Sequence, residues 1–292
     1  MGELIDKLRT RLRDMAFGRT KLQVVSTGDE KYENLCPFFL VTTFRSGSTF
    51  LRLLLNSHSA VCCPPETKFL VHLANMRADP VTEKALDSLG FSTDYVRRQL
   101  RAVASGFYGP HLQAAGKPVL VDKTPDYVRI LDFIDWLYEE KTKFIVLFRN
   151  GLDVAQSMNE TPLDPFDEKK NLQLTFEYWK TDAQLMLNWL SLHPDRCHTV
   201  LYEELCDDLE GEMRKVLDFL GLPWEESVRE WFKTGHERGH EDIKARRQRG
   251  VNKRFGTYEH WDQSLIQEFK AAAKVFHEAM GYDSDTLRPR RS

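Results

Sequence analysis

Two apolar segments that each end at an arginine are the features that most constrain the fold of this 292-residue chain. Residues 38–49 read FFLVTTFRSGST, and residues 143–157 read KFIVLFRNGLDVAQS. In both, a run typical of a buried parallel strand is followed by a glycine-containing turn and a helical pattern. A helix that begins at such a turn offers free backbone N–H groups and the positive end of its dipole to an anion. Two such turns in one chain predict a ligand with two separate phosphate groups.

The first turn carries residue types that suit phosphate. Arg45 supplies a permanent charge with several donors, and Gly47 permits a positive φ or a close backbone approach. Ser46, Ser48 and Thr49 add hydroxyl groups. The nucleotide-binding pattern G-x-x-x-x-G-K-[ST] is absent, because no lysine precedes either Ser48 or Thr49. An ordinary P-loop NTPase is therefore disfavoured, whereas a plain strand-turn-helix connection stays an alternative for this segment alone.

These segments resemble the sulfotransferases that use 3′-phosphoadenosine-5′-phosphosulfate (PAPS). FRSGSTFL is similar to their 5′-phosphosulfate loop, and VLFRNGLDVAQSM is similar to their 3′-phosphate motif. The resemblance extends over about residues 37–281, with fuzzy boundaries. It rests on the joint order of these motifs with four more, which are VLVDKTPDY (119–127), VLYEEL (200–205), FLGLP (219–223) and RQRGVNKRFGTYEHW (247–261).

The resemblance implies which residues hold the donor. The N–H groups of residues 46–49 would bind the 5′-phosphosulfate, while Arg149 and Ser157 would bind the 3′-phosphate. Phe50 and Tyr202 lie where the family places aromatic residues next to adenine, although Phe50 fits a buried core position equally well. The donor-binding residues expected on this basis are Arg45, Ser46, Gly47, Ser48, Thr49, Phe50, Arg149, Ser157, Tyr202, Arg249 and Gly250.

The implied reaction is in-line transfer of a sulfuryl group from PAPS to an acceptor oxygen or nitrogen, with 3′-phosphoadenosine-5′-phosphate (PAP) as product and no metal. Negative charge grows on the bridging oxygen of the departing PAP, so preorganised cations aimed at it lower the barrier. Arg45 and Lys123 are the expected catalytic cations. A solvated lysine at a strand end is the alternative reading of Lys123.

An acceptor hydroxyl also requires a general base. The expected base is Glu66 in CCPPETKF, because the resemblance to tyrosylprotein and carbohydrate sulfotransferases places a glutamate there. His58 and His111 are competing candidates, but the helix-end turn NSHSAV favours a structural role for His58. The small-molecule branch of the family carries a histidine just after its active-site lysine, whereas residues 124–126 read TPD here. That difference favours Glu66.

Composition narrows the classes of partner. The chain has 41 Lys and Arg against 44 Asp and Glu, a net charge of −3, so bulk charge indicates neither nucleic acid nor an anionic membrane. No apolar run approaches the length of a membrane span. The five cysteines lack metal-ligand spacing and are interpreted as free thiols, which predicts a cytoplasmic location. Residues 1–34 are expected to form a helical extension with an amphipathic pattern at Ile5, Leu8, Leu12 and Met15.

The expected fold is α/β, with three layers around a central parallel sheet and the P-loop-like sulfotransferase architecture. All 292 residues are assigned to one domain, with strands in the apolar runs and ligands at the strands' carboxyl ends. Residues 233–256 are expected to form a lid or 3′-phosphate loop. The predicted strand runs are 38–44, 119–122, 143–148 and 197–202.

The predicted function is sulfation of a small-molecule acceptor, including a cationic natural product steered by the acidic residues of loop 159–170. A solvated acidic loop is the plainer interpretation of that segment. A P-loop-type phosphotransferase, a protein or carbohydrate acceptor, and a non-catalytic bisphosphate-binding protein remain alternatives. The acidic residues concerned are Glu160, Asp164, Asp167 and Glu168.

Overall fold

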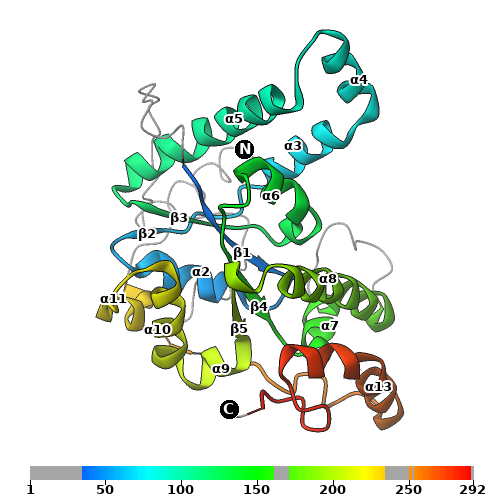
Figure 1. Ribbon diagram of the computed structural model, residues 1–292. Helices are drawn as coiled ribbons and strands as arrows, with labels where there is room; N and C mark the ends of the chain where they lie inside the picture. The colour runs from blue at the N-terminus through cyan, green and yellow to red at the C-terminus, as the bar shows by residue number, and fades with distance from the viewer. Residues whose placement is uncertain (1–34, 161–170, 234–249, 252, 291–292) are drawn as a thin grey trace, which may run out of the picture.

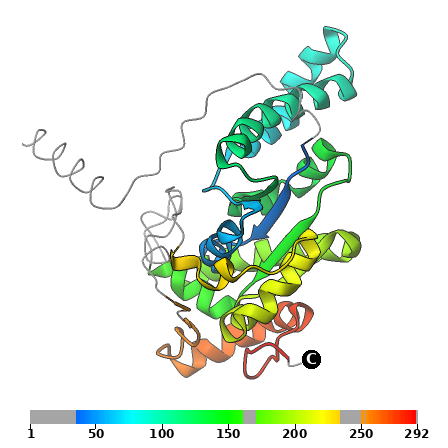
Figure 2. The ribbon, with the colours of Figure 1, turned by 90° about the vertical axis from the view of Figure 1, so that its left-hand side faces the viewer.

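The architecture is a parallel sheet between layers of helices, as a computed structural model shows (Figures 1 and 2). The structure describes residues 35–160, 171–233, 250–251 and 253–290. The described strands form a five-stranded sheet in the order β2-β3-β1-β4-β5, and every neighbouring pair is parallel. The strands are β1 (Phe38–Thr42), β2 (Val61–Cys62), β3 (Val119–Lys123), β4 (Phe144–Phe148) and β5 (Cys197–Leu201).

Helices connect the strands and cover both faces of the sheet. Short 3₁₀ turns lie at Pro125–Arg129, Pro194–Arg196 and Trp231–Lys233. The α-helices are α2 (Ser48–Ser57), α3 (Phe69–Ala78), α4 (Pro80–Ser88), α5 (Thr93–Ala115), α6 (Leu131–Tyr138), α7 (Gly151–Asn159), α8 (Leu172–Leu192), α9 (Tyr202–Asp207), α10 (Leu209–Leu220), α11 (Glu226–Arg229) and α13 (Gln263–Met280).

The core is divided in two by the sheet because side chains alternate between the faces of a strand. On β4, Phe144 and Val146 pack with α5, α6, α8 and α13, whereas Ile145 and Leu147 pack with α2, α9 and α10. All four side chains are fully buried. Burial on both faces explains why this strand reads as an uninterrupted apolar run.

The predicted strands are confirmed, and one further strand is present. Strand β2 was not predicted, because its two residues are too short for a periodic pattern. Two helices, α9 and α10, follow β5 and are separated at Asp208. Its carboxylate accepts a hydrogen bond from the Gly211 N–H at 2.9 Å and so begins a new helix. The predicted N-terminal helix, most of the acidic loop and most of the predicted lid lie outside the described residues.

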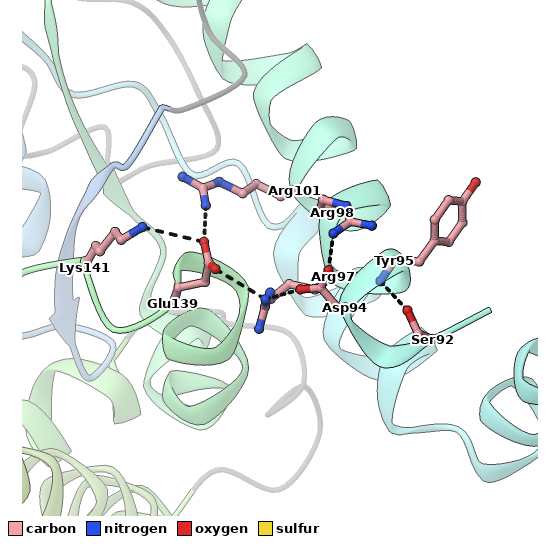
Figure 3. A network of polar contacts seen from close by, with 8 residues as sticks. All are labelled: Ser92, Asp94, Tyr95, Arg97, Arg98, Arg101, Glu139 and Lys141. Atoms are coloured by element: carbon pink, nitrogen blue, oxygen red, sulfur yellow. Dashed lines mark hydrogen bonds and ion pairs between the residues drawn. The ribbon is translucent and has the colours of Figure 1, made fainter.

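Helices α3, α4 and α5 project from one end of the sheet, with α4 farthest out (Figure 1). A polar network ties α5 to the end of α6 (Figure 3). Glu139, which ends α6 with a φ of 55°, accepts hydrogen bonds from Arg101 at 2.9 Å and Arg97 at 3.3 Å. Arg101 also lies over the Tyr138 ring, with 5.6 Å from its guanidinium carbon to the ring centroid. The network thereby holds the N-terminal part of α5 on the body of the protein.

The part of the chain that the structure describes contains no helix long and apolar enough to span a membrane.

Candidate functional site

The first of the two predicted anion-binding turns connects β1 to α2. Gly47 has a φ of 91°, a conformation that side chains disfavour, and it stands at the N-cap of α2. A Cβ added there would lie 2.3 Å from Cδ2 of Tyr202. Arg45 also has a positive φ, of 65°, which costs free energy in a non-glycine residue. Glycine is therefore required at position 47, where the chain enters α2 between the buried residues Ser46 and Ser48.

The second turn meets the first directly. Arg149, which follows β4, is 4% exposed and donates from Nη1 to the Arg45 carbonyl oxygen at 2.8 Å. Its Nη2 donates to the Arg254 carbonyl oxygen at 2.7 Å, and its guanidinium carbon lies 4.7 Å from the centroid of the Tyr202 ring. Arg45 Nε in turn donates to Ser157 Oγ at 3.1 Å. The structure therefore brings the two predicted phosphate sites together at one edge of the sheet.

Two buried polar atoms in this region have no hydrogen-bond partner among the described residues. They are the Nε of Arg149 and the hydroxyl of Ser46. Leaving such groups unsatisfied in a protein interior costs roughly 1–3 kcal/mol each. Both are donors, so an anionic ligand at this edge of the sheet would satisfy them.

The expected base, Glu66, and the expected catalytic cation Lys123 lie together at the end of β3. Nζ of Lys123 donates to Oε1 of Glu66 at 2.8 Å. Lys123 is fully buried and Glu66 is 13% exposed at its side chain, so the solvated-lysine reading is wrong. Strand β3 pairs with β1, with Leu40 opposite Lys123, so this pair lies on the same rim as the Arg45 turn. Lys68 adds a second ammonium group, 3.8 Å from the other carboxylate oxygen.

The competing histidine at position 58 has a structural role. It ends α2, is 1% exposed, and its Nε2–H donates to the Pro223 carbonyl oxygen at 2.9 Å. Its Nδ1 accepts from the N–H of Ala60 at 3.0 Å. Both ring nitrogens therefore bind backbone groups. His111 lies inside α5, near its C-terminal end.

Two aromatic residues expected near adenine occupy different environments. Phe50 is 6% exposed and packs edge-on against Trp231, with 5.5 Å between ring centroids, as a core residue does. Tyr202 lies between Gly47 and the Arg149 guanidinium, next to the two turns. Gly250 is exposed, and Arg249 lies outside the described residues. Their roles in donor binding stay predictions.

Sequence reasoning missed two carboxylates that support the second turn. Asp153, in the first turn of α7, accepts hydrogen bonds from the Thr257 N–H at 2.6 Å and the Gly256 N–H at 3.2 Å. It thereby holds the late basic segment against the 3′-phosphate motif. Glu203 is buried and accepts from the Asn150 N–H at 3.1 Å. Burial raises the pKa of Glu203, and its hydrogen bonds oppose that rise. The position of Asp153, four residues after the strand-end arginine, was the available signal.

His277 of α13 contacts the same turn, at the first residue of α7. Its Nε2 accepts a hydrogen bond at 3.1 Å from the N–H of Gly151, the first residue of α7. Its ring packs against Trp179, with 5.2 Å between the centroids. Burial lowers the pKa of His277 to about 3, because a buried imidazolium would lose its hydration. The neutral ring that can accept from Gly151 is therefore the folded form.

Acid is expected to destabilise the fold through His277. The unfolded chain binds a proton at this residue below its ordinary pKa of 6.5, whereas the folded chain does not until about pH 3. As the pH is lowered from 6.5 to about 3, the free energy of unfolding should therefore decrease, by about 1.4 kcal/mol per pH unit from this group. Chemical denaturation of the wild type and of His277→Gln, which keeps an acceptor, measures the slope. Equal slopes for both proteins would contradict this assignment.

Within the described residues, no three His, Cys, Asp or Glu side chains are arranged to hold a metal ion.

Comparison with known proteins agrees with the geometry. A family model described as "Sulfotransferase family" matches residues 37–226. Protein-tyrosine sulfotransferase A of Caenorhabditis elegans is 25% identical over 208 residues, covering 68% of this chain and 54% of that protein. The nodulation protein NoeE of Sinorhizobium fredii is 30% identical over 209 residues, covering 63% of this chain and 49% of that protein. The chain spans about half the length of these relatives.

Comparison with solved structures also finds sulfotransferases. The sulfotransferase domain from the curacin biosynthetic pathway superposes with a TM-score of 0.59 at 22% identity, covering 85% of this chain and 99% of that domain. This similarity confirms the expected P-loop-like α/β architecture. The family model spans both arginine turns, the Lys123 strand and Glu66, and on that evidence the chain belongs to the sulfotransferase family.

Proposed function

We propose that this protein transfers a sulfuryl group from PAPS to a hydroxyl or amine of a small-molecule acceptor, with Glu66 as general base. The observation that carries the proposal is the 2.8 Å contact between Lys123 and Glu66 on the rim where two arginine turns meet. A base next to a buried cation and an anion-binding loop suits group transfer at an anionic centre.

The described residues fit a nucleotide with phosphate at two positions. The Arg45–Thr49 turn and the N-terminus of α2 would hold the 5′-phosphosulfate. Arg149 and Ser157 would hold the 3′-phosphate, and the unsatisfied Nε of Arg149 is a donor available for that contact. Tyr202, beside both turns, is the aromatic residue that supports adenine binding best.

PAPS, when bound, supplies a sulfuryl group already joined to a phosphate leaving group. Glu66 would take the proton from the acceptor as the acceptor atom bonds to sulfur. Lys123 and Arg45 would stabilise the electron pair left on the bridging oxygen when its bond to sulfur breaks. Lys123 is suited to this role because its burial removes competing water, which strengthens its electrostatic effect.

The charged side chains near Glu66 favour neither a cationic nor an anionic acceptor. Lys68 is 53% exposed, and Arg129, at 44%, pairs with the buried Asp182 at 3.1 Å. Asp126 lies 4.0 Å from Lys68, so the charges there are mixed. Three of the four acidic residues in the cationic-acceptor hypothesis lie outside the described residues, and the fourth, Glu160, accepts a hydrogen bond from Nε2 of Gln156 at 2.6 Å. The hypothesis therefore stays a prediction. A protein tyrosine is the second candidate acceptor, since a protein-tyrosine sulfotransferase is among the relatives.

A cytoplasmic location is part of the proposal. All five cysteines lie in the described residues and all are free thiols, which suits a reducing compartment.

Isothermal titration with PAP, with and without magnesium, tests the proposed function. Adenosine-5′-phosphate is the control ligand, because it differs from PAP only in lacking the 3′-phosphate. PAP is expected to bind equally well with or without magnesium and at least about tenfold more tightly than the control. Equal binding of the two nucleotides, or a requirement for magnesium, would put the phosphotransferase reading first.

A further inference from the structure

A buried carboxylate, Asp122, contacts the residue that follows the proposed base Glu66. Asp122 precedes Lys123 on β3 and is fully buried. Because neighbouring residues of a strand face opposite ways, Asp122 points to the α5 side of the sheet while Lys123 points to the other. Lys123 holds Glu66, and Asp122 accepts a hydrogen bond at 2.6 Å from the hydroxyl of Thr67. Two consecutive strand residues therefore hold two consecutive loop residues.

Thr67 is fixed at both its side chain and its backbone. Its hydroxyl donates to Asp122, so the Tyr127 hydroxyl, 2.7 Å away, must donate to Thr67. The N–H of Thr67 donates to Thr124 Oγ1 at 3.2 Å, and that hydroxyl donates to the other oxygen of Asp122 at 3.3 Å. The hydroxyl of Tyr108, from α5, also donates to Asp122. One acceptor thus orients the whole loop next to Glu66.

The loop also has a strained residue that such a network can maintain. Lys68, immediately after Thr67, has a φ of 57° although it is not glycine. Backbone strain of this kind persists only where surrounding contacts over-determine the conformation. Burial raises the pKa of Asp122, and three hydroxyl donors oppose the rise. Burying a carboxylate costs free energy, and the three hydroxyl donors offset that cost while their own positions become fixed.

We propose that Asp122 is a positioning residue for catalysis, which acts through Thr67 to hold the Glu66 carboxylate where it can take the acceptor's proton. The role rests on the proposed function, in which Glu66 is the base. The Tyr108 hydroxyl connects the same carboxylate to α5, so Asp122 contacts both that helix and the loop that carries Glu66. Without the Thr67 hydroxyl, Glu66 would keep its bond to Lys123, but the next residue would lose its contacts with Asp122 and Tyr127.

A pair of substitutions at Thr67 separates positioning from folding. Thr67→Val removes the hydroxyl at nearly constant shape, and Thr67→Ser keeps it. The reaction measured is PAP formation from PAPS, with phenol, which keeps its proton at neutral pH, as acceptor and with water alone. Thr67→Val is expected to lower kcat by about 10- to 100-fold, as a misplaced catalytic group does. The KM for PAPS and the Kd for PAP should stay unchanged, and Thr67→Ser should restore kcat to within about threefold of the wild type.

Controls keep the two possible failures apart. Thr142→Val removes another buried threonine hydroxyl, which donates to the Pro37 carbonyl oxygen at the opposite end of the strands, and should leave kcat unchanged. Asp122→Asn, which disturbs all the donors at once, should lower kcat at least as much as Thr67→Val. Full kcat in Thr67→Val alongside an inactive Glu66→Gln would overturn the positioning role and leave the proposed function standing. Full kcat in Glu66→Gln would show that Glu66 is not the base, which would overturn that part of the proposed function. If Thr142→Val lowers kcat as much as Thr67→Val does, the loss reflects general destabilisation and the positioning role is overturned.

Discussion

Replacing Glu66 by glutamine is expected to lower kcat by about 100- to 10,000-fold, the usual contribution of a general base. Glutamine has nearly the same shape and can still accept a hydrogen bond from Lys123, 2.8 Å away in the wild type, but it cannot take a proton at neutral pH. Donor binding should be preserved, because the phosphate-binding turns lie on other strands. PAP formation from PAPS with phenol, which keeps its proton at neutral pH, gives kcat, and calorimetry gives the Kd for PAP.

The matched control is Glu83→Gln. Glu83 also pairs with a cation, Arg77 at 2.9 Å, but it is 59% exposed and lies on α4, in the projecting helices. Its substitution should change neither kcat nor the Kd for PAP, since exposed ion pairs contribute little. A wild-type rate in Glu66→Gln would contradict the assignment of the base and reopen the case for His111.

Arg149→Ala should weaken PAP binding by about 10- to 100-fold, since hydrogen bonds to charged groups contribute about 1.5–3 kcal/mol. Adenosine-5′-phosphate should be affected much less, so the preference for the 3′-phosphate should disappear. Arg149→Lys keeps the charge but loses the forked guanidinium that reaches both the Arg45 and Arg254 carbonyl oxygens. It should therefore recover only part of the affinity. Calorimetry with the two nucleotides measures both effects.

Arg129→Ala is the control for loss of an arginine on the same rim. Arg129 lies over the Tyr178 ring, 4.3 Å from its centroid, and pairs with one oxygen of Asp182. The other oxygen of Asp182 accepts a hydrogen bond from the Thr43 hydroxyl at 2.8 Å, so Arg129 reaches the first predicted phosphate-binding turn only through this carboxylate. Its loss should leave PAP binding unchanged. Because Arg149 also binds two backbone carbonyls, thermal unfolding of Arg149→Ala must be followed alongside. Undiminished discrimination between the nucleotides in a folded Arg149→Ala protein would place the 3′-phosphate elsewhere.

The strand ends were predictable because the information for them is local. Strands buried on both faces appear as continuous apolar runs, and a parallel sheet brings their carboxyl ends to one rim. The approximate positions of Arg45, Lys123 and Arg149 followed from these two facts. Strand β2 was missed for the same reason, since its two residues carry no pattern and pair only with the already formed β3. Phe50 could not be assigned because an apolar side chain in a first helical turn suits a core and a ligand equally.

A parallel α/β fold of the sulfotransferase family, with two arginine-ended turns, was predictable from the order of the residues. The contact of Glu66 with the buried Lys123, 57 residues away, and that of Asp122 with Thr67, 55 residues away, became apparent only in the folded chain. The physical reason is that a loop between elements has no periodicity of its own. Its conformation depends on which distant side chains reach it, and those contacts exist only after β3 has paired with β1 and α5 has packed on the sheet.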